Sequence, residues 1–182
     1  MSKEKVMLSE LKAGEVFCGN GERKYKVLKQ EEGQAKVISL GLMAEDKQFD
    51  SSSADYKPSH MKDLIETDIQ PLIEEDFGAD NLVEHEVDLA TVDMQKDYGT
   101  CTCKVRPITF DEAREFNELL VDEKLPDWYW TCTAWSTEKR GWIRGVAVVC
   151  PSGYIGRVIS NFSFGVRPVC ILKSNIFVSK ED

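Results

Sequence analysis

Residues 125–177 constrain the fold of this chain more than any other stretch. Short apolar runs alternate there with glycine, proline and polar turns, and the stretch holds all four tryptophans of the 182-residue chain: Trp128, Trp130, Trp135 and Trp142. Trp128 and Trp130 are two residues apart in an alternating run, so they share one face of a predicted strand. Residues 145–150 are nearly all apolar, which is typical of a strand covered on both faces. The sequence therefore predicts a tryptophan-rich β region over residues 125–177.

Turn residues divide this region into strands. Pro151, Ser152 and Gly153 end the apolar run, so residues 154–159 are expected to pair with it as a hairpin. Residues 166–172 predict a last strand. Pro168 lies inside it and cannot donate to a ladder, which indicates an edge strand or a bulge.

The rest of the chain alternates between strand and helix patterns. Residues 6–40 predict a strand meander with turns at 19–21 and 32–33, and residues 80–89 a strand or extended arm. Residues 59–77 predict helix with Ser59 as N-cap, divided into two short helices by Pro71. Thr109 and Glu112 form the capping box of another helix. The expected fold is α+β, a single domain over residues 1–182 with a mostly antiparallel twisted sheet and two or three short helices.

Charge is distributed unevenly along the chain. Residues 45–97 hold sixteen Asp or Glu against four Lys, a net charge of −12, while the remaining residues sum to +3. One interpretation is a solvated face, and the other is a negative surface for a basic partner, since clustered carboxylates raise the association rate toward positive charge. The predicted partner-binding residues are Glu74, Glu75, Asp76, Asp80, Glu84, Glu86 and Asp88. The same field repels nucleic acid, so direct binding of DNA or RNA is not expected.

Candidate catalytic and metal-binding patterns are weak. The only histidines, His60 and His85, stand in the acidic segment without paired spacing and are interpreted as surface residues. Cys101 and Cys103 are spaced as CxC and not as the CxxC of zinc ribbons. The first residues carry no export signal and no apolar run has the length of a membrane helix, so the six cysteines are expected as reduced thiols in a cytoplasmic protein. We expect no enzyme activity, no metal and no cofactor.

The tryptophan-rich region offers an alternative binding surface. Its proposed ligand loop comprises Trp135, Arg140, Trp142, Arg144 and Arg157, with residues 135–140 expected to be exposed. Trp128, Trp130 and Arg167 are instead expected in the core.

Sequence motifs add a resemblance. WYWTCT, then PSGYI, then GVRPVCILKSNIFVS resembles an uncharacterised domain family of gut Firmicutes, their phages and mobile elements. Members read WWLRSP or WWLATP, then a serine–glycine turn, then GVRP and an apolar strand. KYKVL, FDSSSADYKPS and FGADNLVEHEVDL are also similar to that family, so the resemblance covers nearly the whole chain. The region more loosely resembles the C-type-lectin-like fold of formylglycine-generating enzymes and phage receptor-binding proteins, although the surroundings of Cys150 and Cys170 depart from that enzyme's motif.

Two functions follow from the resemblance and the charge. Small acidic proteins without catalytic motifs are frequent among anti-CRISPR proteins, so the first is a phage or mobile-element protein that inhibits a host defence nuclease through its acidic surface. Its expected partner is a host protein with a basic surface, such as a Cas9–guide RNA complex. The alternative is a lectin-like module that binds a ligand or receptor through the tryptophan and arginine loops.

Overall fold

The computed structural model describes residues 4–181. The strands are β1 (Lys5–Met7), β2 (Val16–Cys18), β3 (Lys24–Glu31), β4 (Gln34–Ser39), β5 (Ala44–Gln48), β6 (His85–Asp88), β7 (Thr100–Cys103), β8 (Val105–Pro107), β9 (Tyr129–Ala134), β10 (Gly145–Val149), β11 (Ile155–Ile159), β12 (Ser163–Val166), β13 (Pro168–Lys173) and β14 (Phe177–Lys180). The α-helices are α1 (His60–Leu64), α2 (Gln70–Phe77), α3 (Phe110–Glu115) and α4 (Asn117–Leu120). Single turns of 3₁₀ helix are η1 (Leu8–Glu10), η3 (Ala79–Asn81) and η4 (Glu138–Arg140), and η2 (Ile65–Ile69) is a π-helical segment.

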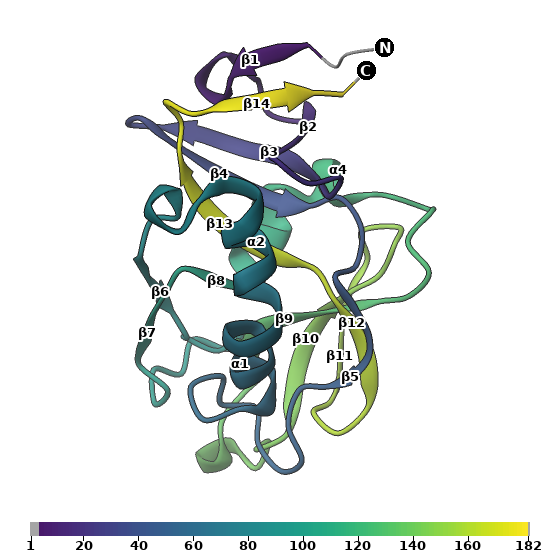
Figure 1. Cartoon of the computed structure of the whole chain (residues 1–182). Helices are drawn as coiled ribbons and strands as arrows, with labels where there is room; N and C mark the ends of the chain where they lie inside the picture. Colours follow the sequence, from purple (N-terminus) through teal and green to yellow (C-terminus); the bar gives the residue numbers. More distant parts are fainter. Residues whose placement is uncertain (1–3, 182) are drawn as a thin grey trace.

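Two sheets organise these strands. The larger has the order β1-β14-β2-β3-β4-β13-β8, and the smaller has the order β11-β10-β9-β12-β5. A separate hairpin, β6–β7, lies on the left of the molecule in Figure 1, and the β10–β11 hairpin lies on the right. Within residues 4–181 the named strands pair antiparallel, except that β12 meets β9 in parallel at Gly165 and Tyr129. Ile108 and Thr131 form a further isolated parallel bridge.

Successive side chains along the inner strands point to opposite faces of the sheet, so hydrophobic clusters form on both faces. In β3, Val27 belongs to the larger cluster and Leu28 to the smaller, and in β4 Val37 and Ile38 divide in the same way. The larger cluster continues through Trp130 of the smaller sheet and is covered by the helical segment of residues 60–77. The smaller cluster is covered by α3 and α4. The expected burial of both faces of residues 145–149 is confirmed, since every residue of β10 is buried.

The segment of residues 60–77 forms one continuous helical rod (Figure 1). Ser59 is its N-cap, as predicted, because its hydroxyl accepts a hydrogen bond from Lys62 N at 3.1 Å. The two predicted short helices are present as α1 and α2, but they are joined end to end and are not divided at Pro71. A π-helical segment precedes Pro71, and the N–H of Gln70 donates to Ile65 O, five residues back. This wider turn places Pro71 in the first turn of α2, where the missing N–H costs nothing.

The chain returns from the smaller sheet to the larger at Arg167. This fully buried guanidinium donates from Nε to Ser39 O at 2.9 Å, which joins the return point to the end of β4. The prediction that Pro168 marks an edge or a bulge is wrong: it is the first residue of β13, an inner strand between β4 and β8. A first residue can lack a ladder donor without loss. Nor is β13 the last strand, since β14 follows and pairs with β1.

The predicted α+β class is confirmed, with strands in mostly antiparallel sheets and a few short helices. The meander of β2, β3 and β4, the β10–β11 hairpin and the capping box of Thr109 and Glu112 are confirmed as well. Within residues 4–181, no helix has the length and apolar character needed to span a membrane.

Candidate functional site

The acidic segment places part of its charge on the surface. Six carboxylates of residues 60–88 are exposed and make no ion pair with any residue of the described range 4–181. They lie on the helical rod, on the turn that follows it, and on β6 or directly before it, and are Asp63, Asp68, Asp80, Glu84, Glu86 and Asp88. We call this set the acidic face. The rod and the β6–β7 hairpin contribute to the same hydrophobic cluster, through Met61 and Ile65 of the rod, Val87 of β6, and Cys101 and Cys103 of β7.

Asp76 does not belong to this surface, which corrects the sequence prediction. Its carboxylate is buried and accepts hydrogen bonds from Arg23 Nε at 2.7 Å and from Tyr25 Oη at 2.5 Å. The hydrogen bond to Asp76 raises the pKa of Arg23 above its ordinary value. The turn of β2 to β3 fits closely over the same residue, since a Cβ on Gly19 would lie 2.3 Å from Asp76 O. Asp76 therefore attaches the helical rod to the larger sheet.

Its neighbours Glu74 and Glu75 are more exposed, but each carboxylate already has a polar partner within the chain. Glu75 forms an ion pair with Arg23 at 3.2 Å, and its side chain is 72% exposed. Glu74 is half-buried and accepts a hydrogen bond from Gln70 Nε2 at 2.9 Å. Of the seven predicted residues, Asp80, Glu84, Glu86 and Asp88 thus remain as unpaired surface charge.

Other acids of the segment organise loops. Asp50 accepts backbone N–H groups of Ser52, Ser53 and His60; burial opposes ionisation there, but these bonds lower its pKa. Asp93 accepts from the Ser136 hydroxyl at 2.7 Å and so connects the loop after β6 to the loop after β9. These carboxylates are structural and do not add to a binding surface.

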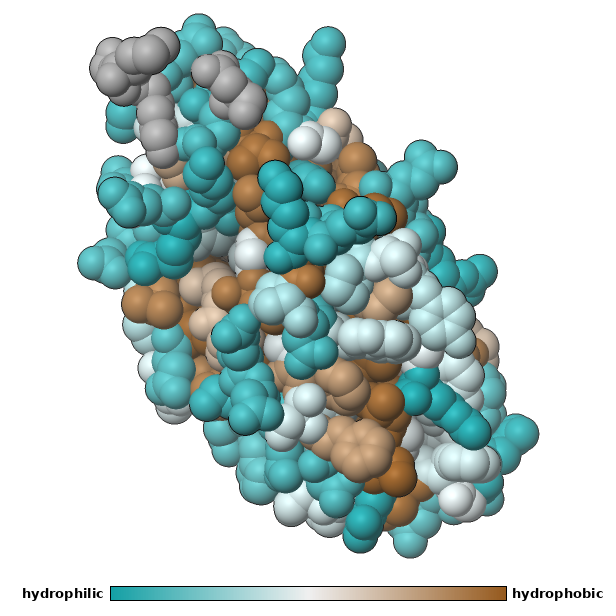
Figure 2. All heavy atoms as spheres, turned by 90° about the vertical axis from the view of Figure 1, so that its right-hand side faces the viewer, coloured by the Kyte–Doolittle hydropathy of each residue, from teal (hydrophilic) through white to brown (hydrophobic). Residues whose placement is uncertain are grey.

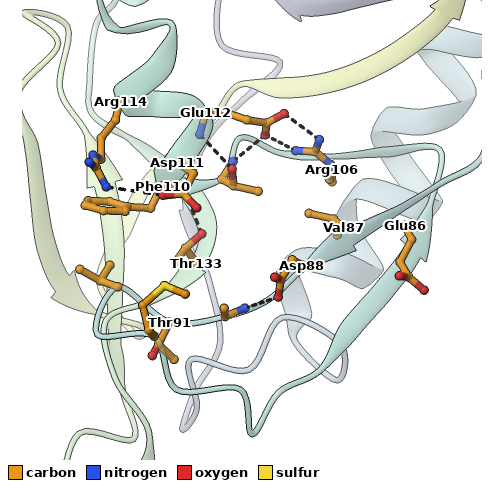
Figure 3. Close-up of a pocket in the computed structure, with 14 residues that line it drawn as sticks. Glu86, Val87, Asp88, Thr91, Arg106, Phe110, Asp111, Glu112, Arg114 and Thr133 are labelled. Carbon is orange, nitrogen blue, oxygen red and sulfur yellow. Dashed lines mark hydrogen bonds and ion pairs between the residues drawn. The ribbon is translucent and has the colours of Figure 1, made fainter.

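A cavity of about 340 Å³ lies beside the acidic face, between β6 and α3. Figure 3 shows Asp88 across the hollow from Arg106 and Glu112. Arg106 and Glu112 form a buried ion pair at 2.6 Å, and Lys36 contacts Glu112 at 2.5 Å. Burial alone would raise the pKa of Glu112, but Arg106 and Lys36 hold it well below its ordinary value. The polar groups at this end of the cavity are therefore satisfied by one another.

His85 is part of the same network and is not the surface residue that the sequence indicated. Its Nε2 accepts a hydrogen bond from Arg106 Nε at 3.0 Å, and its Nδ1 lies 3.0 Å from Val83 O. This arrangement requires a neutral ring with the proton on Nδ1. Burial lowers the pKa of His85 below its ordinary value of 6.5. The other histidine, His60, is exposed as predicted.

The second candidate surface is a groove of about 490 Å³ at one end of the β10–β11 hairpin. Its lining, which we call the Trp–Arg groove, comprises Gly141, Trp142, Ile143, Arg144, Gly145, Arg157, Val158, Ile159 and Phe162. Figure 2 looks onto the side that carries this hairpin in Figure 1, and it shows hydrophobic residues in both halves of that side, including a group in the lower half. Trp142, Ile143, Ile159 and Phe162 are 49%, 39%, 46% and 54% exposed. Large apolar side chains exposed side by side mark binding surfaces more often than isolated ones do.

Local backbone geometry builds this groove. Gly141 adopts a left-handed conformation with φ 79° and ends the turn of η4, so that the chain reverses into Trp142. Gly145 lies close to Trp135, since a Cβ there would be 3.2 Å from the Trp135 Cβ. Arg157 projects from β11 and stacks over the Trp142 ring, with its Cζ 4.3 Å from the ring centroid.

The structure brings together most of the alternative ligand loop. Trp142, Arg144 and Arg157 line the groove, and Trp135 lies 5.9 Å from the Arg157 Cζ. Arg140 stands apart on η4 and does not line it. The loop is less exposed than expected, because Ser136 and Thr137 are buried. Trp130 and Arg167 lie in the core as predicted, and Trp128 is half-buried against Tyr154.

Ile143, Ile159 and Phe162 were not identified from the sequence. Each stands in or beside an apolar strand pattern, which predicts burial and does not indicate a solvent-facing groove. Only the proximity of Ile159 and Phe162 to two arginines in space reveals the surface.

The cysteines form no site in the described part of the chain. All six are buried and form no disulfide, and Cys101 and Cys103 face the same side of β7 as expected. Burial raises the pKa of Cys132 and of Cys170 to about 12, which disfavours the reactive thiolate. Within residues 4–181, no three His, Cys, Asp or Glu side chains come together as possible metal ligands.

Comparison of the chain with protein-family models, curated proteins and solved structures gave no match. The resemblance to the Firmicutes and phage family and the C-type-lectin-like arrangement therefore stay predictions.

Proposed function

We propose that this chain is a non-enzymatic binding protein whose acidic face docks on a basic surface of a host defence nuclease and inhibits it. The single observation that carries the proposal is the acidic face itself, six exposed carboxylates without ion-pair partners in residues 4–181. The expected partner is a guide-RNA-loaded Cas nuclease, and the source is a phage or mobile element acting in a bacterial cytoplasm.

Electrostatics explains why such a face would act as an inhibitor. Nucleases hold nucleic acid in grooves of positive potential, and a negative surface of fixed geometry competes for those grooves. The chain has a formal net charge of −9, so long-range attraction to a basic groove adds to the local contacts. Such attraction raises the association rate and weakens with salt, because the screening length is about 8 Å near physiological ionic strength.

The test compares two variants in a capture experiment. The face variant carries Asp68→Lys, Asp80→Lys, Glu84→Lys and Glu86→Lys, at side chains that make no hydrogen bond or ion pair in the described structure. The groove variant carries Trp142→Ala, Arg144→Gln and Arg157→Gln. Circular dichroism and thermal unfolding first establish that both variants keep the wild-type fold.

Wild-type protein and both variants are then used to capture proteins from a host lysate, with quantification by mass spectrometry. We expect a nuclease ribonucleoprotein to be enriched by the wild type and the groove variant and lost with the face variant. Equal enrichment by the face variant would contradict the proposal. Enrichment of an envelope protein that depends on the groove would favour the receptor-binding alternative.

A further inference from the structure

The Trp–Arg groove differs in charge from the rest of the molecule. Residues 128–170 contain five basic residues against one acid, a net charge of +4 in a chain whose total is −9. Arg144 and Arg157 in the groove are exposed, and neither lies within ion-pairing distance of a carboxylate of residues 4–181. The groove therefore presents two uncompensated positive charges.

Arg157 is held in place before any ligand arrives. Its guanidinium stacks over Trp142 at 4.3 Å and lies 5.9 Å from the Trp135 ring centroid. Such a cation–π contact restricts the side chain but leaves the N–H groups at the guanidinium edge free to donate. A planar donor fork that is fixed in this way matches a carboxylate, which accepts two parallel hydrogen bonds.

Apolar side chains surround this charged centre. Ile143, Ile159 and Phe162 line the same groove and are each at least 39% exposed. Exposed apolar groups around tryptophan and arginine have the composition of protein-interface hot spots. A ligand that filled the groove would need apolar surface for these residues and negative charge for the two arginines.

We propose that the Trp–Arg groove binds a segment of a partner protein in which an aspartate or glutamate stands next to a large apolar side chain. Arg157 donates two hydrogen bonds to the carboxylate, Arg144 supplies the second positive charge, and the apolar side chain packs on Ile159 and Phe162. This surface is independent of the acidic face, which recognises the opposite charge.

Other occupants fit the groove less well. Carboxylate and carboxamide side chains are the commonest partners of sugar hydroxyls, and the groove lining contains neither. The accessible Trp142 ring is also already covered by Arg157. A nucleic-acid strand would bring many phosphates toward a chain of net charge −9. A second copy would place the two arginines of one groove against those of the other in a two-fold dimer.

The experiment selects a displayed library of random dodecapeptides on the immobilised full chain, with counter-selection on the groove variant. We expect enriched peptides to carry Asp or Glu within two positions of Leu, Ile, Phe or Trp. The enriched consensus peptide is then titrated calorimetrically. We expect binding to Arg157→Gln to be at least about tenfold weaker, the effect of losing one charge-assisted hydrogen bond. The face variant serves as the control and should bind as the wild type does.

Three results would overturn the proposal. The first is that no sequence is enriched over the groove variant, or that the enriched sequences lack an acid. The second is equal binding of the consensus peptide to Arg157→Gln. The third is another occupant, seen as groove-dependent binding of a twenty-nucleotide oligothymidylate or as a dimer in sedimentation that the groove variant abolishes. If the face variant captures the nuclease as well as the wild type does, only the proposed function is contradicted, because the peptide experiment does not use the acidic face.

Discussion

Replacing Asp76 with alanine should destabilise the protein strongly although its sequence neighbours are exposed acids. The substitution removes the buried acceptor of Arg23 Nε at 2.7 Å, of Arg23 Nη2 at 2.9 Å and of the Tyr25 hydroxyl at 2.5 Å. Breaking a buried charged pair costs about 3–5 kcal/mol. The side chain of Arg23 is 34% exposed and can regain water, which reduces the cost, while the Tyr25 hydroxyl is buried and loses its partner. We therefore expect a loss of about 3–4 kcal/mol in the free energy of unfolding.

The matched control is Glu75→Ala, which removes the other carboxylate that contacts Arg23. That side chain is 72% exposed, so a loss of less than about 1 kcal/mol is expected. Urea unfolding, monitored by tryptophan fluorescence, measures the loss in the free energy of unfolding for both variants. The two losses can be compared directly if the m-values are unchanged. If Asp76→Ala unfolds within about 0.5 kcal/mol of Glu75→Ala, the assignment of Asp76 as the buried anchor of the helical rod is wrong.

Three further predictions concern stability and thiol chemistry. The pKa of folded His85 is lowered from 6.5, so its contribution to stability is complete above pH 6.5 and is lost as pH falls through the folded pKa. The midpoint of urea unfolding should therefore depend less on pH between pH 5 and 7 in His85→Gln than in the wild type. An unchanged slope would contradict this. Ser59→Ala should cost about 1–2 kcal/mol in urea unfolding, since it removes the N-cap of the rod, and wild-type stability would argue against the cap. Iodoacetamide should label none of the six cysteines in the native protein and all six after denaturation, whereas rapid native labelling of Cys132 or Cys170 would refute their burial.

Local patterns predicted much of the fold. The helix start at Ser59, the capping box of Thr109 and Glu112 and the β10–β11 hairpin depend on residues close in sequence, and all three are confirmed. The position of β13 between β4 and β8 depends on pairing over long sequence separations, which no local pattern encodes. Pro71 was misread because the π-helical segment that accommodates it has no sequence signal.

The candidate surfaces were predictable only in part. The charge excess of residues 45–97 is visible in the sequence, but exposed and buried acids look alike there. Glu75 and Asp76 are adjacent, and only the fold, which brings Arg23 and Tyr25 across more than fifty residues, separates an exposed acid from a buried one. The same limit applies to the Trp–Arg groove. The sequence predicts Trp142, Arg144 and Arg157 as ligand-binding residues, but Ile159 and Phe162 stand in an apolar pattern that predicts burial.

The central claim is tested most directly by DNA cleavage with a purified, guide-loaded Cas9 nuclease. Cleavage rates are measured with increasing amounts of wild-type protein, face variant and groove variant, at low and at high salt. We predict inhibition by the wild type and the groove variant, weaker inhibition at high salt, and none by the face variant at the same concentrations. Undiminished cleavage with the wild type, or equal inhibition by the face variant, would contradict the account.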